Sequence, residues 1–151
     1  MIGVFVENFL RFDKTSIFLL LENNGNDIII PKEKQKEEKM ESKFYEKDKL
    51  LVFKIVDEID ECSAQKIRRE ADYEIKRYMP RKVIFDFDSV TFMDSAGIGL
   101  IIGRYKFVNL LGGKLEVANL TESVKKIFER SGILKLIPVA QLENEQLKIL
   151  K

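Results

Sequence analysis

The stretch FMDSAGIGLIIGRYK at residues 92–106 decides the fold, because it joins a strand-like run to an apolar helix. The run before it, Lys82–Phe87, contains β-branched and aromatic residues, which favour a strand. Asp94 and Ser95 stand where the helix begins, and side-chain oxygens there accept bonds from the first free backbone N–H groups. The stretch therefore predicts a strand, a turn and a helix in succession.

The hydroxyl of Ser95 is predicted to lie at the positive end of the helix dipole, beside Gly97 and Gly99. A phosphate group is well tolerated at such a position, because free N–H groups point towards it. An ordinary helix cap explains the same residues. On the residues alone, both a structural cap and a phosphate acceptor remain open.

Strand-like and helix-like runs alternate along the rest of the chain, which predicts an α/β domain with parallel strand pairs. The second predicted helix places five apolar residues on a core stripe, with Leu100 and Phe107 on another face, which is either buried or a docking patch. The stripe comprises Ile98, Ile101, Ile102, Tyr105 and Val108. Strands are expected at residues 44–45, 50–56, 83–87, 114–118 and 135–138, and helices at 63–79, 95–111, 121–132 and from about 141.

The stretch at 92–106 resembles the phosphorylation-site signature of STAS-domain anti-sigma factor antagonists, most closely those that act on sporulation sigma factors. The resemblance covers residues 43–150. Its other matching parts are Glu58–Asp60, Ala64 and the runs at 111–117, 124–128 and 131–135. It implies an α/β fold, a STAS-type mixed β-sheet of about four to five strands with about four helices packed on it.

The resemblance also implies a function and a set of site residues. The unphosphorylated antagonist binds an anti-sigma factor that is also its serine kinase, which releases the sigma factor. Phosphorylation of the motif serine, here Ser95, ends the interaction, and a metal-dependent serine phosphatase restores it. The implied partner-binding residues are Asp60, Asp94, Ser95, Ala96, Gly97, Ile98 and Gly99.

Two departures from close relatives bear on this site. Ala96 stands where a second serine often occurs, so Ser95 is the single candidate acceptor in the motif. Asp57 stands where a glycine is often seen, close to Asp60. Asp60 has a second interpretation as the N-cap of the first helix, and both roles can hold together.

The chain changes character near residue 40, where the mixed-charge run at 32–39 predicts a solvated linker. We expect residues 40–151 to form the STAS domain. Residues 1–39 are either a native N-terminal extension or upstream sequence preceding a natural start at Met40. The intact mass of the protein from its native host decides between these, because a species containing residues 1–39 would exclude the second.

The amino-acid composition limits the classes of partner and of chemical activity that we expect. The chain has 26 Lys and Arg residues and 25 Asp and Glu residues, so its net charge is +1. A charge this small gives no electrostatic reason to expect binding to nucleic acid or to an anionic membrane. The apolar runs are far shorter than the roughly 20 residues of a membrane span. The single cysteine, Cys62, suits the reducing cytoplasm. We expect no cofactor.

Two rival functions remain. The chain has no histidine, which argues against catalysis and against a metal site, although Asp86, Asp88 and Asp94 cluster in sequence and could form an acidic site. We therefore expect that the protein is not an enzyme. The second rival is a STAS module of another partner-switching system, such as control of a stress-response sigma factor.

Overall fold

A computed structural model describes residues 38–140 of the 151-residue chain. Its strands are β1 (Met40–Tyr45), β2 (Leu50–Ile55), β3 (Lys82–Asp86) and β4 (Lys114–Ala118). Its helices are α3 (Glu61–Tyr78), α4 (Ser95–Leu110) and α5 (Glu122–Ser131), followed by the short 3₁₀ helix η1 (Ile133–Lys135). Predictions that fall on residues 1–37 and on 141–151, including the final helix, lie outside the described residues.

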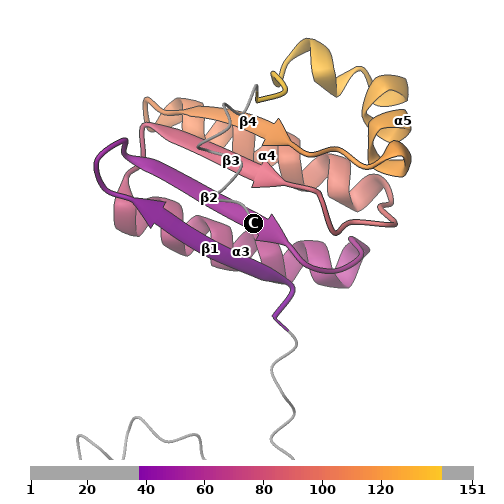
Figure 1. Cartoon of the computed structure of the whole chain (residues 1–151), viewed down its shortest axis with the longest axis horizontal. Helices are drawn as coiled ribbons and strands as arrows, with labels where there is room; N and C mark the ends of the chain where they lie inside the picture. Colours follow the sequence, from indigo (N-terminus) through magenta and orange to yellow (C-terminus); the bar gives the residue numbers. More distant parts are fainter. Residues whose placement is uncertain (1–37, 141–151) are drawn as a thin grey trace, which may run out of the picture. The chain divides into compact units, whose positions relative to one another are not determined.

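The four described strands form one sheet in the order β1-β2-β3-β4 (Figure 1). The hairpin strand β1 pairs with β2 in antiparallel fashion, whereas β2, β3 and β4 are parallel to one another. The predicted mixed sheet is therefore confirmed. Because parallel strands end at the same edge, the loops that follow β2 and β3 leave the sheet side by side.

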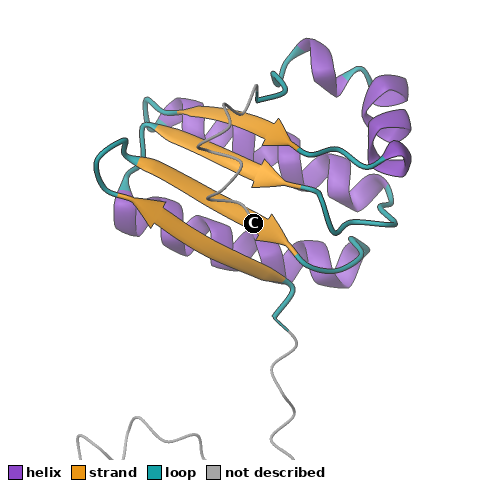
Figure 2. Cartoon of the chain, viewed as in Figure 1, coloured by secondary structure: helices purple, strands orange, loops and turns teal. Residues whose placement is uncertain are grey.

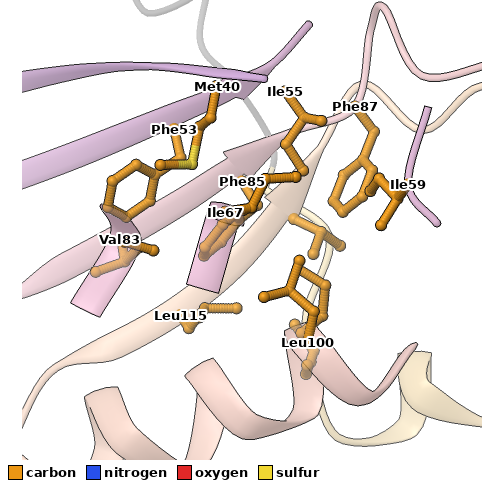
Figure 3. Close-up of a cluster of buried hydrophobic side chains, with 14 of the residues drawn as sticks. Met40, Phe53, Ile55, Ile59, Ile67, Val83, Phe85, Phe87, Leu100 and Leu115 are labelled. Carbon is orange, nitrogen blue, oxygen red and sulfur yellow. The ribbon is translucent and has the colours of Figure 1, made fainter. Parts of the chain in front are cut away.

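Helices α3 and α4 pack against each other, and both cover the same face of the sheet (Figure 2). Their buried side chains meet those of the strands in one core, part of which is shown in Figure 3. The rings of Phe53 and Phe85, from neighbouring strands, lie 4.9 Å apart between centroids and are tilted by 35°, and Ile67 of α3 is fully buried. Ile59 and Leu100 extend this core towards the ends of the two helices where the chain enters them.

One sequence-based expectation about local structure is wrong. The strand expected at 135–138 does not form, because η1 ends at Lys135 and only an isolated bridge between Val117 and Val139 follows it. Pro138 explains this, because its backbone has no N–H group to continue a ladder. For the second face of α4, which the sequence left open as buried or a docking patch, burial is found at Leu100. Since α4 packs on α3 as well as on the sheet, a second face of α4 is buried.

Candidate phosphorylation and partner-binding site

A bridge between two loops brings the candidate residues together. Ile59, in the loop after β2, donates its N–H to the carbonyl oxygen of Phe92 at 3.0 Å, and its own carbonyl accepts the N–H of Asp94 at 3.0 Å. Asp60 follows Ile59, and Ser95 follows Asp94. The beginnings of α3 and α4 are therefore held next to each other, with Asp60, Asp94 and Ser95 on one end of the domain.

Both aspartates cap their helices. Asp60 forms a capping box with Ser63, in which the Ser63 N–H reaches the Asp60 carboxylate at 2.7 Å and the Asp60 N–H reaches the Ser63 hydroxyl at 2.9 Å. Asp94 accepts the Ala96 N–H at 2.7 Å and is the N-cap of α4. Ser95 is then the first residue of α4, is exposed, and its hydroxyl does not serve as the cap. This leaves the hydroxyl on the surface at the positive end of the helix.

The remaining residues of the motif differ in accessibility. Gly97 is buried, Ala96 and Ile98 are half-buried, and Gly99 is exposed. A side chain on Gly97 would overlap Cγ and Sδ of Met93, whereas one on Gly99 would meet no atom within 4 Å. Close packing therefore explains the glycine at 97, but it does not explain the one at 99.

This contrast predicts opposite effects of the two Gly→Ala substitutions. Gly97→Ala should lower the free energy of unfolding by about 1–3 kcal/mol, because the new methyl group overpacks the bridge region. Gly99→Ala should raise it by up to about 1 kcal/mol, because alanine favours the helix and has room. Urea unfolding of both variants measures this, and changes of the same sign would contradict it.

Hydrogen bonds and an ion pair favour the charged form of two carboxylates, Asp57 and Asp60, in the loop between β2 and α3. The hydrogen bonds from Ser63 hold the pKa of Asp60 below its ordinary value of 3.8, and the hydrogen bond from Lys39 does the same for the pKa of Asp57. A lowered pKa in the folded state favours the charged carboxylate there.

Folding stability should therefore depend on pH in the acid range. Both carboxylates contribute their full stabilisation above their unfolded pKa, and lose it as the pH falls through the lowered folded values. We expect the free energy of unfolding to fall as the pH drops below about 4. Urea unfolding between pH 6 and pH 2.5 measures this, and Asp60→Asn should show a shallower pH dependence. An unchanged slope in that variant would contradict the assignment to Asp60.

A groove of about 380 Å³ runs between α3 and α4 and begins beside the motif. Ala96, Gly99 and Gly103 line its α4 side, and Gln65 and Arg68 line its α3 side. The small residues on α4 keep the groove open. It offers a recess that starts at Ala96, the residue after Ser95, and that has room for a partner side chain.

Arg104 of α4 also lines this groove and was not among the candidate residues that the sequence suggested. Arg104 is buried, its Nη1 lies 2.7 Å from Oδ1 of Asp72, and the same nitrogen donates to the carbonyl oxygen of Arg68 at 3.4 Å. Burial lowers the pKa of Arg104, and the charge of Asp72 opposes that shift. The signal that could have found it is its position one helical turn after Leu100 and Ile101, which places a cation on the apolar side of the helix, unlike Lys106.

The acidic cluster proposed as a rival site has a structural role. Asp86 is fully buried, and its Oδ1 accepts the N–H of Asp88 at 3.0 Å and the side-chain amide of Asn119 at 3.1 Å. Between residues 38 and 140, no three Asp, Glu or Cys side chains are placed to hold a metal ion. Over the same residues, no helix is long and apolar enough to cross a membrane.

Comparisons with known proteins agree with this architecture. The STAS domain family model matches residues 41–145. The anti-sigma F factor antagonist of Paenibacillus polymyxa is 30% identical over 90 residues, covering 60% of this chain and 77% of that protein. The anti-sigma-B factor antagonist of Listeria monocytogenes is 26% identical over 107 residues, covering 70% and 91% of the two chains.

Solved structures share the fold. The anti-sigma factor antagonist SpoIIAA in its unphosphorylated form matches with a TM-score of 0.61 and 24% identity, covering 74% of this chain and 95% of that one. SpoIIAA from Bacillus in its phosphorylated form matches with a TM-score of 0.56 and 23% identity, covering 74% and 99%.

Proposed function

The chain belongs to the STAS domain family, and on this premise we propose that it is an anti-sigma factor antagonist. In its unphosphorylated form it binds an anti-sigma factor that is also a serine kinase, and this binding releases the sigma factor. Phosphorylation of Ser95 switches the protein off. The observation that carries the proposal is the exposed Ser95 hydroxyl at the start of α4, beside the Asp60 cap of α3.

The surface around Ser95 is suited to a switch that works by charge. A phosphate adds about −1.5 to −2 charges at pH 7, and a helix N-terminus tolerates it because the dipole there is positive. The domain can therefore remain folded while the surface changes. Asp60 and Asp94 add negative charge beside the phosphate, so docking of an acidic partner group that faces them is opposed.

In this proposal the partner surface consists of Asp60 and the exposed parts of the motif. The motif residues that face the partner are Asp94, Ser95, Ala96, Ile98 and Gly99. The absence of a side chain at Gly99 allows the partner's backbone, or one of its side chains, to approach the groove. Gly97 contributes indirectly, because its close packing against Met93 holds the turn in place.

Other proteins add and remove the phosphoryl group on Ser95. The anti-sigma factor transfers the phosphoryl group to Ser95, and a metal-dependent serine phosphatase removes it. The protein itself is a regulatory binding module that acts in the cytoplasm, where the sigma factor and its partners are found.

The acceptor can be tested by intact mass after incubation with the anti-sigma factor kinase of the same organism and ATP. We expect one added phosphate on the wild type and none on Ser95→Ala. Ser89→Ala is the matched control, because Ser89 is also exposed but lies in a turn outside any helix. A wild type that stays unmodified by an active kinase, or a phosphate that persists in Ser95→Ala, would overturn the proposal.

A second candidate function is control of a stress-response sigma factor by the same partner-switching chemistry. It is favoured by the similarity to anti-sigma-B factor antagonists, which extends over 70% of this chain. Binding to each anti-sigma factor of the organism, measured side by side, separates the two. Tight binding to the kinase of the sporulation sigma factor supports the first function, and tight binding to the stress-response kinase supports the second.

A further inference from the structure

An ion pair fastens the loop that carries Asp60 to the residue just before β1. Lys39 Nζ contacts the Asp57 carboxylate, and the Lys39 carbonyl accepts the N–H of Val56 at 3.1 Å. Asp57 also accepts the N–H of Glu58 at 2.7 Å. The Lys39 side chain is 17% exposed, which is low for a lysine so close to the edge of the sheet. Backbone and side chain of Lys39 thus hold the same loop.

The short loop between β2 and α3 is held at a second place, at Ile59. Two residues after Asp57, Ile59 makes the two-bond bridge to Phe92 and Asp94, and Asp60 then caps α3. The charge of Lys39 is also the smallest of the influences that lower the pKa of Asp60, after the hydrogen bonds from Ser63 and from the Cys62 backbone. The cap at Asp60 therefore lies only three positions after Asp57 of the Lys39–Asp57 contact, and the bridge at Ile59 lies between them.

We propose that Lys39 and Asp57 are positioning residues for the partner-binding surface, setting the place of Asp60 relative to Ser95. They do this by fixing the start of the loop whose end forms the bridge to the α4 turn. Neither residue needs to touch the partner. The inference concerns the loop and rests on the proposed function only where partner binding is used as a readout.

The first test uses the full chain alone and measures amide hydrogen exchange. Lys39→Met keeps the apolar stem and removes the charge. We expect the amides of Ile59 and Asp94 to exchange about two- to fivefold faster than in the wild type, the size expected from losing a partly exposed ion pair. Lys39→Arg should restore slow exchange.

Lys82→Met is the matched control, because Lys82 pairs with Glu116 at 2.9 Å near the other end of the sheet. It should leave exchange at Ile59 and Asp94 unchanged. Unchanged exchange in Lys39→Met, or an equal increase in both variants, would overturn the positioning role whether or not a partner binds.

The second test measures affinity for the kinase that phosphorylates Ser95. Lys39→Met makes the surface more negative and Asp57→Asn makes it more positive. If the pair positions Asp60, both variants weaken binding by about two- to fivefold. If the charges act on the partner directly, the two variants change affinity in opposite directions, which would overturn the inference. A wild type that binds no anti-sigma factor would refute the proposed function, and the exchange test would still decide the role of Lys39.

Discussion

The form of the protein phosphorylated on Ser95 should bind the anti-sigma factor at least about 100-fold more weakly than the unphosphorylated form, while its fold stays the same. This ratio corresponds to about 2.7 kcal/mol of binding free energy, which is within the cost of placing like charges together in an interface. The phosphate would sit at the start of α4, beside the carboxylates of Asp60 and Asp94.

Titration of the kinase with each form measures the affinity, and amide spectra of the two forms compare their structures. We expect shifts confined to residues near 94–99, because the N-terminus of α4 accommodates the phosphate without rearrangement. Ser95→Ala, exposed to kinase and ATP, should keep its affinity. Widespread shifts would show that phosphorylation acts by changing the fold.

Among substitutions of residues that are not fully buried, Asp72→Ala should cause the largest loss of stability. It leaves the buried Arg104 without its counter-charge. Removing one partner of a buried pair costs about 3–5 kcal/mol. Because the Asp72 side chain is 26% exposed, water compensates in part, and we expect a loss of about 2–3 kcal/mol. Urea unfolding at pH 7 measures this change.

Two further variants test the origin of that loss. Glu74→Ala removes the partner of Arg77, whose guanidinium lies 3.9 Å away and whose side chain is 56% exposed, and should change stability by less than about 0.5 kcal/mol because the arginine left behind is solvated. Adding Arg104→Met to Asp72→Ala should recover most of the lost stability, because no charge is then buried unpaired. A double variant as unstable as the single one would point to lost packing instead of an unpaired charge.

Local patterns in the sequence predicted most of the fold. The helix caps at Asp60, Asp94 and Thr121 are formed, because each polar residue stands directly before an apolar helical run. The strands were predicted by short apolar runs between turns, and the resemblance to the STAS family supplied their arrangement. The strand expected at 135–138 failed because a short run containing Pro138 cannot be separated from a 3₁₀ turn by its pattern.

The contacts that shape the site could not be predicted, because they join residues far apart in the chain. The bridge between Ile59 and Met93 joins two loops, and Arg104 of α4 pairs with Asp72 of α3. Lys39 reaches Asp57 across the β1–β2 hairpin. No periodicity marks such pairs, since each depends on how the elements pack. The candidate residues were therefore named from the sequence, but their meeting at one end of the domain required the structure.

The central claim is that this chain releases a sigma factor by competing for its anti-sigma factor, and that a phosphate on Ser95 prevents it. The most direct measurement adds each form to a preformed complex of sigma factor and anti-sigma factor and follows the release of the sigma factor. We predict release by the unphosphorylated chain and by Ser95→Ala, and none by the phosphorylated chain. A sigma factor that stays bound in the presence of excess unphosphorylated chain would contradict the claim.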